Sequence, residues 1–158
     1  MKKLIASFIA VATQAFSGVD TVVQVVFGEA KESAQSIFSM SVEGAMTVLA
    51  SIGRVEVESI LMVGGVSTTN TGKFIGRMLL NGEQVGDSVA VTVTGTGNYA
   101  PLKLSNTFSE LTSSDVITVE VIADATGTTT TGSLVLVDGT SDAAAWTSVA
   151  PAVINVYG

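Results

Sequence analysis

Apolar and polar positions alternate most clearly in the stretch that begins after Gly53. From Arg54 to Met62, Val55, Val57 and Ser59 fall on one side of an extended chain, and Glu56, Glu58 and Ile60 on the other. A period of two residues is typical of a β-strand with one buried face. We therefore predict a half-buried strand here.

Two further apolar runs follow, Lys73 to Leu80 and Glu83 to Thr94, with only Asn81-Gly82 between them. A type I′ turn needs positive φ at both central residues, and Asn-Gly meets that need better than most pairs. The sequence therefore predicts a tight β-hairpin at Asn81-Gly82.

Short runs of the same kind recur along the rest of the chain, separated by Gly, Ser and Asn. They are residues 1–16, 21–27, 37–42, 45–51, 99–108, 116–123, 133–137 and 152–157. Pro101 predicts a sheet edge for residues 99–108, and residues 28–34 are expected to form a loop. A helix over Glu29 to Met40 is the alternative there, since Ala30, Ala34 and Phe38 are four residues apart. About ten strands without a required helix predict an all-β, antiparallel β-sandwich of the jelly-roll kind, as one domain over residues 1–158.

The first sixteen residues allow two interpretations. Phe8, Ala10, Ala12, Gln14 and Phe16 share one side of an extended chain, which predicts an N-terminal strand or an arm reaching a neighbouring subunit. Lys2-Lys3 followed by Leu4 to Ala12 also resembles a signal peptide, with Ala10-Val11-Ala12 as a cleavage site. The apolar run is too short to span a bilayer.

The amino-acid composition excludes several classes of function. Apolar residues make up 47% and charged residues 13%, and the net charge is −7. A neutral surface is typical of virion and other oligomeric proteins, whereas a nucleic-acid binder needs a basic footprint. The sequence has no cysteine and no histidine, which excludes disulfides, thiolate and imidazole ligands, and Ser-His-Asp or Cys-His catalysis.

The acidic and aromatic residues offer a few candidate sites. Glu56 and Glu58 could form a glycosidase pair or a calcium site, or a solvated strand face paired with Arg54, Lys73 or Arg77. Asp115, Asp124, Asp138 and Asp142 lie at loop edges, where they could cap turns or hold calcium. Thr128 to Thr131 could be a mobile loop or contact a glycan. Trp146 could fill the core or anchor an interface.

The order of short motifs resembles a family of small tailed-phage virion proteins with a jelly roll similar to tumour necrosis factor and complement globular heads. The longest matching run is residues 77–88, RMLLNGEQVGDS, and the resemblance extends over about Phe8 to Val156. Further matching positions are Val23 to Ala30, Glu43-Gly44, Gly53, Gly64-Gly65, Asp115 to Glu120, Gly132-Ser133-Leu134 and Trp146. The chain departs from the family at Arg54, where relatives carry an aromatic residue, and at Ala123, where they carry arginine.

The resemblance implies a homotrimer on the exterior of a phage capsid, with the major capsid protein as partner. We therefore expect a non-enzymatic decoration, or cement, protein that needs no cofactor or metal and binds neither nucleic acid nor membrane. A host-recognition module of a tail fibre or spike is the first alternative, and a secreted pilus or matrix subunit is the second. The interface candidates are Lys2, Lys3, Phe8, Phe16, Trp146 and Tyr157.

Overall fold

The computed structural model describes residues 2–10, 12–32, 37–64, 70–95, 98–129, 135–136 and 152–158, and each regular element in these ranges is a β-strand. The predicted all-β class is confirmed. The strands are β1 (Leu4–Ile9), β2 (Gln14–Ala15), β3 (Val23–Gln24), β4 (Glu29–Glu32), β5 (Phe38–Met40), β6 (Met46–Val48), β7 (Val55–Gly64), β8 (Thr71–Leu80), β9 (Glu83–Thr94), β10 (Tyr99–Phe108), β11 (Val116–Ala123), β12 (Val135–Leu136) and β13 (Val153–Tyr157).

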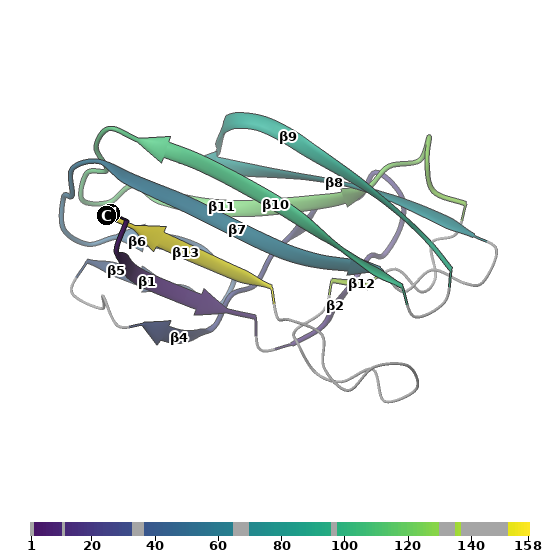
Figure 1. The fold of residues 1–158 in the computed structure, drawn as a ribbon, viewed down its shortest axis with the longest axis horizontal. Coiled ribbons are helices and arrows are strands. Elements are labelled where there is room, and N and C mark those ends of the chain that lie inside the picture. The colour runs from purple at the N-terminus through teal and green to yellow at the C-terminus, as the bar shows by residue number, and fades with distance from the viewer. Residues whose placement is uncertain are drawn as a thin grey trace.

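The strands form two antiparallel sheets that pack face to face. In the seven-stranded front sheet the order is β2-β12-β7-β13-β1-β4, and β10 pairs with the other side of β7. In the six-stranded back sheet the order is β5-β6-β11-β8-β9, and β3 also pairs with β11. Figure 1 shows β10, β7, β13, β1 and β4 side by side, with β11 passing behind them. This is the predicted antiparallel sandwich.

The core lies between the inward faces of the two sheets. On β7, Val55, Val57, Leu61 and Val63 are at most 1% exposed, and on β11 the inward residues Ile117, Val119 and Val121 are fully buried. Phe16 and Phe74 pack with ring centroids 5.3 Å apart. Alternation in the sequence therefore reports which face of each long strand is buried.

The predicted hairpin is present between β8 and β9. Leu80 pairs with Glu83, and the two turn residues have φ of 52° at Asn81 and 84° at Gly82. Both values are positive, as a type I′ turn requires. β10 pairs only with β7 among the described strands, so the edge position predicted from Pro101 is also confirmed.

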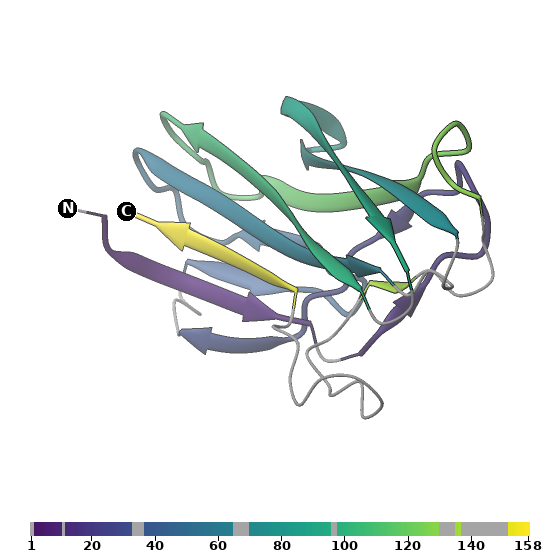
Figure 2. The ribbon, with the colours of Figure 1, turned by 45° about the vertical axis from the view of Figure 1, so that its right-hand side comes forward.

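The first strand is shorter than predicted. β1 ends at Ile9, and Gln14–Ala15 forms the separate strand β2, which pairs with β12. β1 lies between β13 and β4 in the front sheet, so the strand interpretation fits residues 4–9 and the arm interpretation does not. Figure 2 shows the two chain ends side by side, where Lys3 and Gly158 exchange two backbone hydrogen bonds of 3.0 and 2.8 Å.

The loop predicted for residues 28–34 is wrong at Glu29–Glu32, which forms β4 against β1. The helical alternative for residues 29–40 is wrong as well, since the described part of that range contains β4 and β5. Glu-Ala-Lys-Glu has low strand propensity, and its pairing with the open edge of β1 decides its conformation.

Other predicted strands are present but shorter. The run at 21–27 is a strand only at Val23–Gln24, and the run at 45–51 only at Met46–Val48. In the run at 133–137 the described residues, 135–136, form β12.

Candidate assembly face

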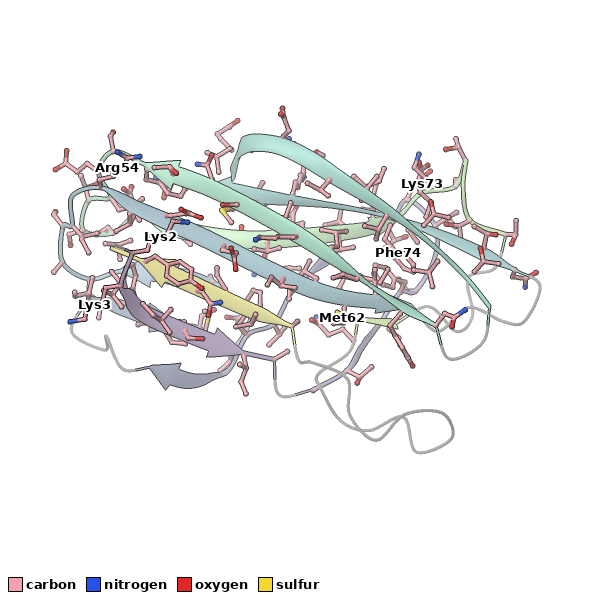
Figure 3. The ribbon with its side chains drawn as sticks, viewed as in Figure 1. Lys2, Lys3, Arg54, Met62, Lys73 and Phe74 are labelled. Carbon is pink, nitrogen blue, oxygen red and sulfur yellow. The ribbon has the colours of Figure 1, made fainter. Side chains whose placement is uncertain are left out.

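The outward side of the front sheet carries a strip of apolar side chains. Ile60 of β7 lies opposite Val153 of β13, which in turn lies opposite Ile9 of β1. Met62 follows on the same side of β7, and Figure 3 shows its position on the sheet. We call Ile9, Ile60, Met62 and Val153 the apolar strip. All four are half-buried, and none belongs to the cluster of side chains packed on the core.

Charged residues flank the apolar strip, and Glu56 and Glu58 among them have lysine partners. Glu58 Oε2 lies 3.0 Å from Nζ of Lys103, and Glu56 Oε2 lies 2.5 Å from Nζ of Lys2. The Ser105 hydroxyl also donates to Glu56 Oε1 at 3.2 Å. Cross-strand pairs of opposite charge suit a sheet face. The described part of this face therefore carries balanced charge beside its apolar strip.

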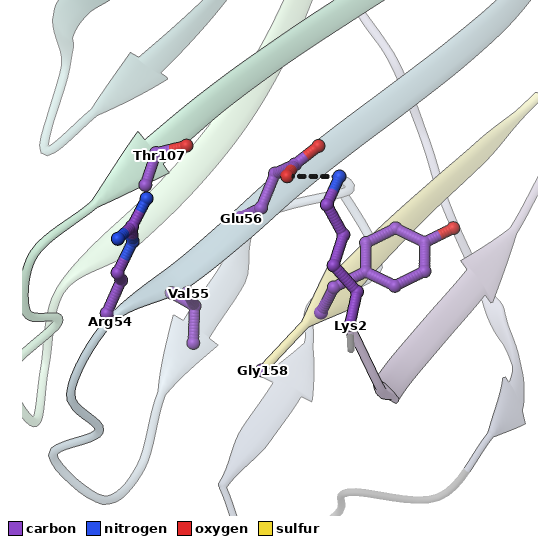
Figure 4. A pocket seen from close by; sticks show the side chains of 7 residues that line it. Lys2, Arg54, Val55, Glu56, Thr107 and Gly158 are labelled. Atoms are coloured by element: carbon purple, nitrogen blue, oxygen red, sulfur yellow. Dashed lines mark ion pairs between the residues drawn. The ribbon is translucent and has the colours of Figure 1, made fainter.

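One end of the face is hollowed into a shallow cavity of about 340 Å³, lined by Lys2, Arg54, Val55, Glu56, Thr107, Tyr157 and Gly158. Figure 4 shows Lys2 extending across the cavity to Glu56. The Lys2 ammonium lies 5.8 Å from the centroid of the Tyr157 ring, within the range of a cation–π contact. The mutual hydrogen bond raises the pKa of Lys2 and lowers the pKa of Glu56, so both stay charged at neutral pH.

The predicted interface residues fall into three groups. Lys2 and Tyr157 lie on this face, and the Lys3 side chain is exposed beside it. Phe8 and Phe16 are only 5% and 4% exposed, so their side chains are covered within the chain's own core. Trp146 lies outside the described residues.

The predictions missed the apolar strip itself, although one signal was present. Ile60 and Met62 are apolar residues that follow Glu56 and Glu58 on the same side of β7. An isoleucine among carboxylates on the solvent side of a strand indicates a surface that something covers. Ile9 and Val153 carry no such local signal, because only the pairing of β1, β13 and β7 brings them beside Ile60.

Glu56 does not have the electrostatics of a glycosidase acid. A glycosidase acid needs a raised pKa so that it holds a proton near neutral pH, whereas the pKa of Glu56 is lowered by Lys2. The pair is a strand face bridged to lysines, as the structural alternative expected. Its partners are Lys2 and Lys103, and Lys73 and Arg77 instead pair with Asp124 and Glu120 in the back sheet.

Of the four aspartates predicted at loop edges, the two that the structure describes, Asp115 and Asp124, cap turns. Asp115 accepts hydrogen bonds from the Thr112 amide at 2.8 Å and the Thr112 hydroxyl at 3.0 Å. Asp124 accepts from the Thr126 amide at 3.0 Å, and Asn81 donates to Asp115 at 2.8 Å. Asp138 and Asp142 lie outside the described residues. Within the described part of the chain, no three Asp or Glu residues gather as metal ligands would.

The threonine-rich loop is fixed to β8 over its described part. The Thr129 hydroxyl accepts from the Thr71 amide at 2.7 Å, and the Thr128 hydroxyl accepts from the Lys73 amide at 3.1 Å. Asp124 also forms an ion pair with Lys73 at 2.9 Å. Thr128 and Thr129 are thus bonded to β8, and mobility of the loop Thr128 to Thr131 stays a prediction. Thr130 and Thr131 lie outside the described residues.

The two packed antiparallel sheets form a jelly roll of the tumour-necrosis-factor type. Among solved structures, the chain is similar to murine APRIL, a member of that family, at pH 8.0, with a TM-score of 0.55, 12% identity, and coverage of 98% of this chain and 97% of that one. A second structure of murine APRIL, at pH 8.5, gives a TM-score of 0.52 and 11% identity over the same shares. Identity this low shows the fold alone.

No protein-family model matches the sequence, and no curated protein is similar to it. The fold part of the sequence resemblance is thus confirmed, and the virion part stays a prediction. Across the residues that the structure covers, no helix has the length and apolar character of a membrane span.

Proposed function

We propose that this chain is a non-enzymatic structural protein of a phage virion, which assembles as a homotrimer and decorates the head exterior. The observation that carries the proposal is the outward face of the front sheet, where the apolar strip lies beside charges that are already paired. Burying this surface costs less free energy than burying one with unpaired carboxylates, because Glu56 and Glu58 keep their lysine partners.

The apolar strip supports self-association. Ile9, Ile60 and Val153 form one row across three adjacent strands, and isolated surface apolar residues do not usually line up in this way. A jelly roll presents this sheet as a broad, rigid surface, so several copies can meet without refolding. The sequence resemblance implies that the number of copies is three.

The rest of the surface supports attachment to a shell. Charged residues are only 13% of the chain and the net charge is −7, so much of the exterior is Ser, Thr and Gly. A head under internal pressure gains stability when a rigid molecule spans neighbouring capsomers, because ligand binding to the intact state shifts the equilibrium towards it. A trimer offers three equivalent contacts for this purpose.

The test is the mass of the protein in solution, followed by binding to heads that lack decoration. A mass of about three chains, together with binding that raises the heat resistance of the heads, is the expected result. A trimer that ignores heads but adheres to host cells would replace the decoration proposal with host recognition. A monomer that does neither would overturn both.

One observation favours host recognition as the second candidate. The threonine-rich loop lies against the start of β8, where the Thr71 amide donates to the Thr129 hydroxyl and the Thr129 amide donates to the Thr71 carbonyl. A hydroxyl-rich loop fixed to the end of a strand in this way forms a polar surface of the kind that contacts glycans. Replacing Thr128 and Thr129 by alanine should then abolish adhesion to host cells and leave head binding intact.

A further inference from the structure

Asn81-Gly82 is the one Asn-Gly pair in the sequence, and this pair has its own chemistry. The backbone nitrogen of the glycine can attack the side-chain carbonyl carbon of the asparagine. Ammonia leaves and a five-membered succinimide forms, which water then opens to aspartate or isoaspartate. Glycine presents no side chain to hinder the attack, so an exposed Asn-Gly turn is the most reactive setting for this deamidation.

In the folded chain, three hydrogen bonds hold Asn81 to the start of β11. Its Nδ2 donates to Asp115 Oδ1, its Oδ1 accepts from the Val116 amide, and its backbone amide donates to the Val116 carbonyl, each at 2.8 Å. Both polar atoms of the side chain are therefore bonded, although Asn81 and Gly82 are exposed to water.

These contacts oppose each step of the reaction. The side-chain carbonyl carbon must turn towards the Gly82 nitrogen, and this rotation breaks the bonds to both Asp115 and Val116. The departing nitrogen is the atom that donates to Asp115. With φ of 52° and 84°, the turn itself is fixed in the type I′ geometry by its pairing to the strands. The barrier is conformational, since water already reaches the turn.

We propose that Asn81 is a deamidation site that the fold protects, and that the site reacts only when the hairpin separates from β11. Once Asn81 has reacted, the hairpin can no longer pack against β11 as before. The product carries a carboxylate where the amide donated to Asp115, so two negative charges would face each other in place of a hydrogen bond. Deamidation would therefore mark, and keep open, the copies whose hairpin has separated.

The test compares the folded chain with the same chain unfolded in urea, in one mildly alkaline buffer. Conversion of Asn81 to aspartate and isoaspartate is followed by digestion and mass spectrometry. We expect conversion to be at least about tenfold slower in the folded chain, because it requires local opening. Equal rates in the two states would overturn the proposal, and this comparison needs no variant.

Two substitutions test whether the hydrogen bonds from the Asn81 side chain to Asp115 and Val116, which we call the clamp, slow the reaction. Asp115→Ala removes the acceptor of the Asn81 amide and should speed conversion in the folded chain. Thr112→Val removes only the hydroxyl bond to Asp115 and should leave the rate at that of wild type. If folded Asp115→Ala, verified by circular dichroism, reacts no faster than Thr112→Val, the clamp has no protective role.

A third variant tests whether the product blocks return. Asn81→Asp reproduces the main charge change, and it should melt at a lower temperature than wild type at neutral pH. The difference should shrink in acid, where the facing carboxylates become protonated. A melting temperature equal to that of wild type at neutral pH would show that reaction does not keep the hairpin open.

Discussion

A few side chains attach the threonine-rich loop to β8 of the back sheet, and Asp124 does so through an ion pair with Lys73. The Lys73 ammonium, together with the Thr126 amide and hydroxyl, lowers the pKa of Asp124 from its ordinary 3.8 to about 2. A carboxylate held in this way favours the folded state only while it is ionised. The attachment of this loop therefore depends on pH.

We expect the free energy of unfolding to fall as the pH is lowered from about 3.8 to about 2. In this range Asp124 binds a proton in the unfolded chain but stays ionised in the folded chain, so acid favours unfolding. Asp124→Asn should flatten this part of the pH profile. Lys73→Gln should flatten it partly, because the Thr126 hydrogen bonds remain. Urea titrations across the range measure the effect, and Asp87→Asn, at an exposed position of β9, is the control.

Two glycines with positive φ differ in what surrounds them. Gly44 has φ of 89°, and a Cβ there would collide with the backbone carbonyl of Val25. Gly82 has φ of 84°, and a Cβ there would meet nothing within 4 Å. Gly44 is required both because its φ is positive and because a side chain there would collide with the backbone at Val25, whereas Gly82 is required only because its φ is positive.

Gly82→Ala should therefore lower the free energy of unfolding by about 1–2 kcal/mol, the cost of a left-handed alanine. Gly44→Ala should cost clearly more, because the chain at Val25 must move as well. Urea denaturation of both variants gives the comparison. Equal losses would mean that the contact with Val25 relaxes without cost.

At the scale of elements, the long strands were predictable and their neighbours were not. The ranges predicted for residues 83–94, 99–108 and 116–123 match β9, β10 and β11. β11 alternates along its whole length, and β9 alternates from Val89 to Thr94 after the predicted turn. β4 was missed since its sequence is polar and its strand conformation depends on pairing with β1. The same limit applies to the site. Lys2 and Tyr157 were predicted as interface residues, but the apolar strip exists only once β1, β13 and β7 are side by side.

The position of β1 gives an element-scale prediction. Deleting residues 1–7 removes most of β1, which pairs with both β13 and β4, and also the Ser7–Asn155 hydrogen bond of 2.6 Å. We expect a chain that fails to fold, with loss of the cooperative melting transition. Replacing Lys2 and Lys3 by alanine keeps β1 and should keep the transition. A folded deletion variant that merely fails to bind heads would restore the arm interpretation.

At the scale of the whole molecule, the apolar strip should control assembly. Ile60→Asp should raise the concentration at which copies associate by at least about tenfold, because an unpaired carboxylate in an apolar contact costs more than the ~1.4 kcal/mol that tenfold represents. Val42→Asp, at a position 87% exposed, is the matched control. Sedimentation of both variants measures the shift, and an unchanged mass for Ile60→Asp would place the interface elsewhere.

The order of strands in the front sheet also bears on how the chain is made. β13, near the end of the sequence, fills the space between β1 and β7. During synthesis on the ribosome, β1 emerges early, and both it and β7 present unpaired backbone edges until residues 153–157 arrive. Open edges of this kind recruit other chains. The nascent protein should therefore depend on chaperones until β13 has emerged, and a ribosome stalled ahead of β13 should hold a product prone to aggregate.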